Sequence, residues 1–172
     1  MLGWTFFEIN QHLTEGCLIA DRKLDRQVAL IDSAFETVKP SHSYVCYRGE
    51  TINVQEGENF EKAVMREFFP DTIIDRKPYL STSMNPSIAS YFAKKNKRSI
   101  ILEIRAKSGI SLKNLSDSSK EEEMLLPRGS RFKVLMVKPY VHYQKINYCE
   151  ESNNLSETRE SQQIMTVVLE EV

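Results

Sequence analysis

Three separate groups of side chains in this sequence could carry out chemistry, and the first is a run of carboxylates. Glu121, Glu122 and Glu123 stand directly before an apolar segment that has the pattern of a buried strand. If the strand begins near Glu121, its period of two places Glu121 and Glu123 on one face and Glu122 on the other. Two neighbouring carboxylates at the edge of a core are costly unless each has a partner or a function. A solvated strand end is the alternative interpretation of the same residues.

The other two groups each stand at the end of an apolar stretch. In SYVCYRG, residues 43–49, Arg48 could offer its planar guanidinium to a phosphate, and Gly49 would let a ligand approach the backbone. An ordinary salt bridge from Arg48 is the simpler alternative. The third group is the serine-threonine-serine run at 81–83, and such residues commonly satisfy nearby backbone groups. Each group is weak on its own, so the interpretation depends on their order along the chain.

The elements that must hold these groups begin with helices. Apolar residues recur every three or four positions from Leu24 to Val38, which predicts an amphipathic helix after a shorter one at the N-terminus. A third amphipathic pattern lies within 56–69. Asn85 and Pro86 predict the start of a fourth helix, because asparagine caps helix N-termini and proline fits the first turn.

Strand patterns dominate the second half of the chain. In the segment 98–104, the alternate residues Ile100, Leu102 and Ile104 would share one face. Further strands are expected at 122–126, 131–137, 141–146 and 164–170, with a polar loop at 149–161. Helices first and strands later are typical of an α+β fold, so we expect an antiparallel or mixed sheet core with helices packed on it.

The composition is that of one globular domain, with 172 residues, 41% hydrophobic and 27% charged, and a net charge of −1. Nine basic residues and one acid lie between Arg76 and Lys113, which suits a phosphate-bearing ligand or a nucleic acid, although exposed surfaces also carry such charges. Cys17, Cys46 and Cys149 follow no disulfide or metal-binding spacing, so we expect free thiols and no metal. No signal peptide or membrane-spanning segment is indicated, so we expect a cytoplasmic protein without membrane contact. No pattern indicates an oligomeric state.

In chain order, the three groups resemble the signature of an enzyme family. The sequence combines an aromatic-Arg-Gly strand, a Leu-Ser-Thr-Ser strand leading into a helix, and Glu-x-Glu followed by apolar residues and Pro127. These motifs are similar to those of the arginine-serine-glutamate class of mono-ADP-ribosyltransferases, above all its bacteriophage and bacterial-toxin members. The resemblance covers residues 44–137. It implies a single domain over 1–172, with N-terminal helices in 1–40 and, in 44–172, an NAD-binding and catalytic core of two packed sheets.

The resemblance also implies an activity and its catalytic residues. Members of the family cleave NAD between nicotinamide and ribose and pass the ADP-ribose to a target, without a metal. The transition state resembles an oxocarbenium ion, so negative charge is needed near the ribose. Glu123 would bind a ribose hydroxyl and stabilise this developing charge, while Glu121 would orient and deprotonate the nucleophile. Ser81 would hydrogen-bond Glu123 and keep it aimed.

The same resemblance assigns the residues that bind NAD, which is expected as the substrate. Arg48 would hold an NAD phosphate, and the backbone of Gly49 would hold the nicotinamide amide. Thr82 and Ser83 would support the end of their strand. Phe92 lies on the next helix, where some family members place an aromatic ring under the nicotinamide. As an inward residue of an amphipathic helix, however, Phe92 is assigned to the core.

The acceptor of ADP-ribose separates the remaining alternatives. Glutamate at the first position of Glu-x-Glu is the family's mark of arginine modification, so arginine side chains of a host protein are the first expectation. The enzyme would then act in the host cytoplasm if it is phage-encoded or injected. Transfer to a base of RNA or DNA is a second alternative, which the basic segment favours. NAD hydrolysis, which would not need Glu121, is a third, and a non-catalytic binding module is the fourth.

Overall fold

Two helices precede every strand of the fold, as the sequence predicts. The structure, a computed structural model, describes residues 3–15, 22–37, 42–93, 98–112, 122–151 and 154–172. The helices in these ranges are α1 (Gly3–Glu15), α2 (Arg22–Thr37), α3 (Phe60–Glu67) and α4 (Pro86–Ala93). The strands are β1 (Tyr44–Thr51), β2 (Ile73–Arg76), β3 (Leu80–Ser83), β4 (Ser99–Ala106), β5 (Ile110–Ser111), β6 (Glu123–Leu126), β7 (Ser130–Glu151) and β8 (Asn154–Glu171).

The strands form one mixed sheet with the order β2-β7-β8-β4-β1-β3-β6-β5. Its described pairs are antiparallel except for β4 with β8. β1 pairs with β4 along its whole length, whereas β1 and β3 meet at the single register pair of Tyr47 and Ser83. The sheet therefore has a five-stranded and a three-stranded half that join at this pair. The expected α+β fold is confirmed. The expectation of two packed sheets was wrong, because the pair of Tyr47 and Ser83 joins both halves into one continuous sheet.

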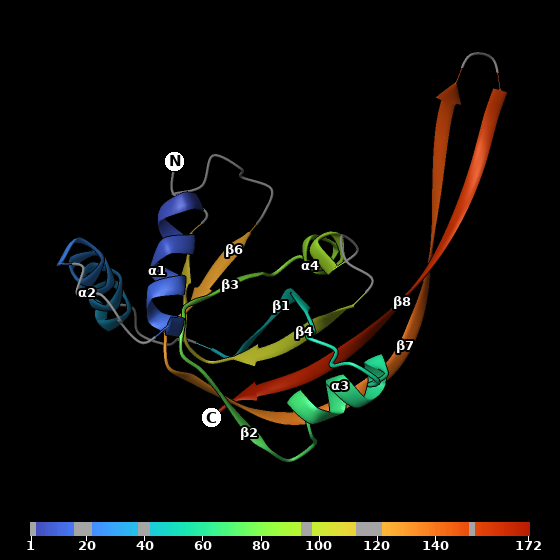
Figure 1. The fold of residues 1–172 in the computed structure, drawn as a ribbon. Helices are drawn as coiled ribbons and strands as arrows, with labels where there is room; N and C mark the ends of the chain where they lie inside the picture. Colours follow the sequence, from blue (N-terminus) through green and yellow to red (C-terminus); the bar gives the residue numbers. More distant parts are fainter. Residues whose placement is uncertain (1–2, 16–21, 38–41, 94–97, 113–121, 152–153) are drawn as a thin grey trace.

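Helices cover both faces of the five-stranded half. On one face, Ile100, Leu102 and Ile104 of β4 pack in the main core cluster together with residues of α3. On the other face, Ile101 packs in a separate cluster with Ala89 of α4. The alternation expected for this strand is confirmed: the face of Ile100, Leu102 and Ile104 is buried throughout, whereas the other face is buried at Ile101 and exposed at Arg105. In Figure 1, α3 and α4 accordingly lie on opposite sides of β4.

Local signals explain where two of the helices begin. The side chain of Asn59 accepts the backbone N–H of Lys62 at 2.9 Å and caps α3. The side chain of Asn85 accepts the backbone N–H of Ser87 at 2.9 Å, and Pro86 is the first residue of α4, as predicted. Because only two residues separate β3 from α4, the end of β3 is fixed close to this helix.

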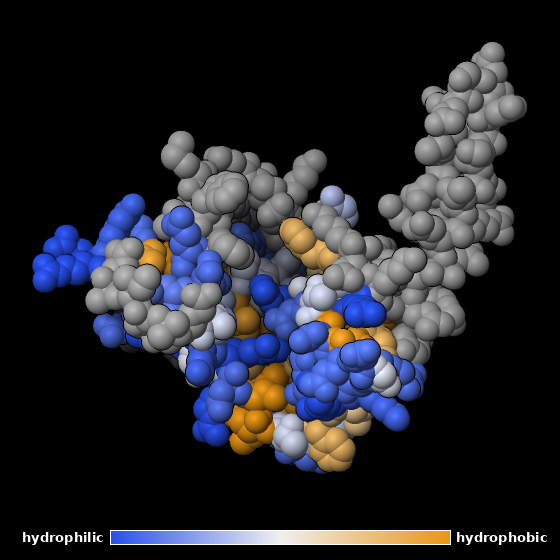
Figure 2. Space-filling view, in the orientation of Figure 1, coloured by the Kyte–Doolittle hydropathy of each residue, from blue (hydrophilic) through white to orange (hydrophobic). Residues whose placement is uncertain are grey.

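The helices α1 and α2 pack on the three-stranded half of the sheet. Their apolar faces form a second core cluster with Tyr79 and Leu125. The carboxylate of Asp32 on α2 accepts hydrogen bonds from the Tyr79 hydroxyl and from Arg128 Nη2, both at 2.7 Å. The outward side of α2 is hydrophilic (Figure 2). α2 thus holds the residues just before β3 and just after β6.

Two segments differ from what the sequence predicts. A polar loop is expected at 149–161, but β7 continues to Glu151 and β8 begins at Asn154, so the strands form a long ribbon that extends from the body (Figure 1). Backbone pairing holds polar residues in this ribbon as well as apolar ones, which explains why composition concealed it. The short strand β2 is not anticipated, because its four residues gain their strand conformation from pairing with β7 rather than from a local pattern.

Candidate active site

A cavity of about 330 Å³ opens where the two halves of the sheet diverge. Residues of β1, β3, β6 and α4 line it. Every predicted site residue except Glu121 contributes to the lining: Arg48, Gly49, Ser81, Thr82, Ser83, Phe92 and Glu123. The volume lies in the range of small-molecule sites. The fold therefore gathers into one cavity side chains that three distant motifs supply.

Strand pairing brings Ser81 and Glu123 together. The register of β3 and β6 places Ser83 opposite Glu123, so Ser81 is the diagonal neighbour of Glu123 on the same face. Diagonal neighbours lie about 7–8 Å apart, which long side chains can span. The Ser81 hydroxyl donates a hydrogen bond to Glu123 Oε1. The Glu123 carboxylate is thereby oriented at the cavity wall by its neighbouring strand.

Arg48 reaches the same cavity from β1. Its Nη1 donates to the backbone carbonyl of Ser81 at 2.7 Å, and its Nε donates to Glu50 Oε1 at 2.9 Å. The described parts of the chain supply no partner for its Nη2. Arg48 thus bridges β1 and β3 in the region where their backbone pairing is limited to one residue pair. The remaining guanidinium donors could bind an anion in the cavity.

Gly49 faces the backbone of helix α4. A Cβ at this position would lie 2.6 Å from the carbonyl oxygen of Ala89 and 2.8 Å from the backbone nitrogen of Ala93. Such contacts are too short for any residue with a side chain, so glycine permits the close packing of α4 on β1. This packing is sufficient reason for a glycine here. Approach of a ligand to its backbone stays a prediction.

Thr82 and Ser83 bond to protein groups beside the cavity. Thr82 Oγ1 donates to the backbone carbonyl of Met124 at 2.9 Å, across the β3–β6 pair. Ser83 Oγ accepts the backbone N–H of Asn85 at 3.0 Å, in the turn that leads into α4. These bonds strengthen the strand pairing and the strand-to-helix turn around Ser81.

Phe92 is not a core residue, so its assignment from helix periodicity was wrong. Phe92 is 51% exposed on the cavity wall, beside Tyr91, which is 61% exposed. The two rings meet edge to face with their centroids 5.7 Å apart. The assignment failed because α4 buries its small residues, Ala89 and Ala93, against the sheet. Their close approach turns the aromatic residues outward.

Glu121 lies outside the described residues, and β6 starts later than the sequence predicts. The strand begins at Glu123, and Glu122 has a φ of 39°, in the left-handed region. The backbone carbonyl of Glu122 accepts the N–H of Met84 at 3.2 Å. Extended strand geometry through all three glutamates was therefore a wrong expectation, because a residue at positive φ breaks the alternation of side chains. Relative positions of Glu121 and Glu123 do not follow from a period of two.

The sequence interpretation missed two parts of the site. Tyr47 and Ile88 also line the cavity. Behind Arg48, the Glu50 carboxylate accepts a second hydrogen bond from Arg76 Nη2 at 2.9 Å. The period of two could have placed Glu50 beside Arg48, because alternate residues of a strand share a face. No local sequence pattern predicts that Arg76 of β2 contacts Glu50.

The described ranges also hold histidine, cysteine and carboxylate side chains outside the cavity. No set of three or more histidine, cysteine, aspartate or glutamate side chains is placed there to hold a metal ion. Cys46 is fully buried, and burial raises the pKa of its thiol to about 11, so it is a core residue rather than a nucleophile. None of the described helices has the length and apolar character required to span a membrane.

Comparison with solved structures identifies similar folds. Plx2a, an ADP-ribosyltransferase toxin from Paenibacillus larvae, superposes with a TM-score of 0.67 at 22% identity, over 96% of this chain and 79% of that one. Exoenzyme S from Pseudomonas aeruginosa, solved with human 14-3-3 protein beta and carba-NAD, gives 0.68 at 19% identity, over 99% and 68%. The C2-I component of Clostridium botulinum C2 toxin gives 0.71 at 18% identity, over 99% of this chain but 41% of that one. No curated protein matches the sequence.

The sequence also matches a family as a whole. The family model of the ADP-ribosyltransferase exoenzymes matches residues 5–169, which is nearly the entire chain. The protein belongs to the ADP-ribosyltransferase exoenzyme family. The resemblance to mono-ADP-ribosyltransferases of the arginine-serine-glutamate class is thus confirmed. The protein is an NAD-dependent transferase, and NAD is its substrate.

Proposed function

We propose that the protein transfers ADP-ribose from NAD to arginine side chains of a host protein and releases nicotinamide. The observation that carries this proposal is the Ser81–Glu123 hydrogen bond, made in a cavity that Arg48 also lines. A carboxylate held by a fixed donor is suited to stabilise positive charge that develops on a ribose. The guanidinium of Arg48 on β1 is suited to bind a phosphate of the same substrate.

Each cavity residue that the sequence predicted has a place in this proposal. Arg48 binds an NAD phosphate, and the backbone of Gly49 binds the nicotinamide amide. Glu123 binds a ribose hydroxyl and stabilises the cationic transition state. Phe92, exposed on the cavity wall, supplies an aromatic surface for the nicotinamide ring. Thr82 and Ser83 keep the end of β3 in place through their hydrogen bonds.

The transfer step needs a group that takes a proton from the acceptor. A nitrogen of the acceptor guanidinium attacks C1′ of the ribose while the bond from C1′ to nicotinamide breaks. Nicotinamide leaves with the electron pair of that bond. The arginine nitrogen loses a proton, for which Glu121 is the proposed base, because a guanidinium is a poor nucleophile while charged.

Two variants separate transfer from hydrolysis. Glu123→Gln is expected to reduce both transfer and NAD hydrolysis by about 10²–10⁴-fold, because it removes the charge that stabilises the transition state. Glu121→Gln should abolish transfer to arginine but leave hydrolysis, since water needs less activation by that group. Equal loss of both reactions in Glu121→Gln would refute the division of roles. Near-normal activity of Glu123→Gln would refute the proposed site.

The class of acceptor is tested with labelled NAD and a whole cell lysate. One half of the reaction products is treated with nuclease and the other with protease. Label that survives nuclease but not protease supports a protein acceptor, and mass spectrometry then identifies the modified side chain. Label lost with nuclease would replace arginine by a nucleic-acid base as the acceptor. Release of nicotinamide without label on any macromolecule would favour a glycohydrolase.

We further propose that residues 1–172 act as one catalytic domain in the cytoplasm of the host cell. The shared core of α1, α2, Tyr79 and Leu125 supports this, because the helices in 1–40 complete the burial of the strands in the 44–172 core that carry Ser81 and Glu123. A variant chain beginning at residue 42 should therefore lose NAD hydrolysis and unfold at a lower temperature. Full activity of this shorter chain would contradict the proposal.

A further inference from the structure

A single carboxylate joins two arginines directly behind the cavity. Glu50 Oε1 accepts from Arg48 Nε at 2.9 Å, and Glu50 Oε2 accepts from Arg76 Nη2 at 2.9 Å. The Glu50 side chain is 15% exposed, less than that of either arginine. Hydrogen bonds between such charged groups are about twice as strong as neutral ones and have a defined direction. The Glu50 carboxylate is therefore a rigid connection between β1 and the arginine of β2.

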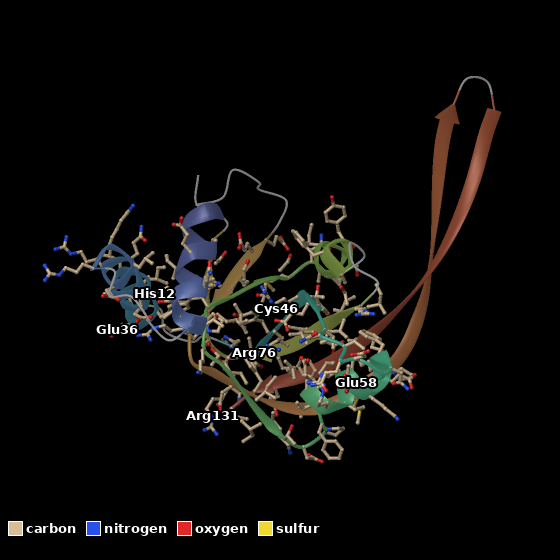
Figure 3. The ribbon with its side chains drawn as sticks, viewed as in Figure 1. His12, Glu36, Cys46, Glu58, Arg76 and Arg131 are labelled. Carbon is tan, nitrogen blue, oxygen red and sulfur yellow. The ribbon has the colours of Figure 1, made fainter. Side chains whose placement is uncertain are left out.

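Arg76 is anchored on its far side. Its guanidinium carbon lies 5.5 Å from the ring centre of Phe68, a buried residue that follows α3. Its Nε is buried and has no hydrogen-bond partner within the described residues. Glu50 is thus the carboxylate that forms an ion pair with Arg76, while Glu67 acts on the same charge from a greater distance. In Figure 3, Arg76 lies over the middle of the molecule and its side chain is 26% exposed, whereas Arg131, on the adjacent strand β7, lies at the outer edge and is 58% exposed.

The position of the Glu50 carboxylate between two arginines is not what electrostatic attraction of a phosphate alone would require. The three side chains carry a formal sum of one positive charge, where two arginines alone would carry two. Glu50 therefore weakens the general attraction for anions. In return, it fixes direction: Arg48 Nε is bound to Glu50 and Arg48 Nη1 to the Ser81 carbonyl, so two strands determine the guanidinium plane.

We infer that Glu50 is a positioning residue for NAD binding. Glu50, itself held by Arg76, orients the Arg48 guanidinium so that its remaining donors can bind a phosphate of the dinucleotide. This inference rests on the proposed binding of NAD by Arg48. A role in charge neutralisation alone would make a different prediction, because the site would then bind NAD more tightly once the negative charge was removed.

The variants Glu50→Asp and Glu50→Gln separate the two roles through the KM for NAD and the kcat of nicotinamide release. Glu50→Asp keeps the charge but shortens the side chain, so positioning predicts a KM about tenfold higher with kcat within about twofold of wild type. Glu50→Gln keeps the shape and removes the charge. Positioning again predicts a higher KM, whereas neutralisation predicts a lower one. An unchanged or lower KM in either variant would overturn the inference.

Glu58→Gln is the matched control for these variants. The Glu58 side chain is also 15% exposed and pairs with an arginine, Arg66, but Arg66 does not line the cavity as Arg48 does. Its KM and kcat are expected to equal those of wild type. If Glu50→Asp fails to fold, Arg76→Lys tests the same connection, since it keeps the charge but loses the guanidinium geometry. A raised KM with unchanged kcat is expected there too, and a wild-type KM would overturn the inference.

Arg48→Lys distinguishes failure of this inference from failure of the proposed function. An unchanged KM in Arg48→Lys would mean that Arg48 does not bind NAD, whatever the Glu50 variants show. A raised KM in Arg48→Lys together with a wild-type KM in both Glu50 variants would refute the role of Glu50 alone. When Arg48→Lys is combined with Glu50→Gln, the double variant should raise the KM by less than the two single effects predict together. Both substitutions act through the same guanidinium.

Discussion

The Ser81 hydroxyl donates a hydrogen bond to the carboxylate of Glu123, which lies 42 positions further along the sequence. Ser81→Ala should therefore lower the kcat of nicotinamide release by about 10–100-fold, since an unoriented carboxylate stabilises the transition state less well. The variant also has an internal control. In a Glu123→Gln background, Ser81→Ala should cause little further loss, because the two side chains act as a unit. Fully additive losses would contradict this coupling.

The glycine beside Arg48 is expected to resist substitution for a steric reason. Gly49→Ala places a methyl group against the backbone of Ala89 and Ala93, so we expect a loss of about 1–3 kcal/mol in the free energy of unfolding and a raised KM for NAD as α4 shifts. Gly57→Ala is the comparison, since no atom lies within 4 Å of its added Cβ and its φ is 76°. It should lose stability through backbone strain while its KM stays at the wild-type value. Denaturant unfolding and steady-state kinetics measure both effects.

The attachment of α2 should depend on pH through Asp32. The hydrogen bonds from Arg128 lower the pKa of the Asp32 carboxyl, against the opposing effect of its burial. A depressed pKa in the folded state means that this stabilisation is present above the unfolded value, about 3.9, and is lost as the pH falls through the lower folded value. Asp32→Asn should therefore lower the melting temperature at pH 7.

The difference between wild type and Asp32→Asn should shrink as the pH falls below 4. Thermal unfolding across a pH series measures it. Asp75→Asn is a suitable control, because Asp75 pairs with Arg131 at the surface and its side chain is 72% exposed. A difference between wild type and Asp32→Asn that stays constant from pH 7 to pH 3 would contradict the assignment.

The thiol of Cys46 should be inert in the folded protein. Burial raises its pKa to about 11, so roughly one thiol in a thousand would be ionised at pH 8 even if reagent could reach it. With Cys17 and Cys149 replaced by serine, iodoacetamide should modify the remaining thiol only after unfolding by denaturant. Mass spectrometry detects the adduct. Rapid alkylation of the native protein at pH 8 would mean that β1 opens readily.

The backbone at Glu122 should favour glycine over any branched residue. Its φ of 39° lies in the left-handed region, where residues with a Cβ are strained by about 1–2 kcal/mol. Glu122→Gly should raise the melting temperature or leave it unchanged, while Glu122→Val should lower it. The reverse order of the two melting temperatures would show that the turn before β6 differs from this structure.

Much of the site could be predicted from the sequence because its signals are local. Alternating apolar residues mark β4, and Asn85 with Pro86 marks the start of α4. Arg48, Ser81 and Glu123 could be selected because each borders an apolar segment of the sequence within a motif of defined order. These patterns concern only bonds and side chains within a few residues of one another.

The predictions that were wrong concern contacts between residues that are distant in the sequence. Phe92 is exposed because small residues of α4 pack against Gly49 of β1, a contact that helix periodicity alone does not reveal. The left-handed turn at Glu122 appears where the chain meets Met84 from the end of β3. The polar ribbon of β7 and β8 was mistaken for a loop because its backbone bonds come from pairing.

Sequence alone therefore accounts for most of the polar residues that gather at the cavity. It does not account for Glu50, which receives one arginine from its own strand and another from β2, 26 positions along the chain. The period of a strand defines the two faces that its side chains can occupy, but it leaves open which strand lies beside it. That choice depends on how the whole chain buries its apolar surface, so the contacts around Arg48 arise only when the two halves of the sheet come together.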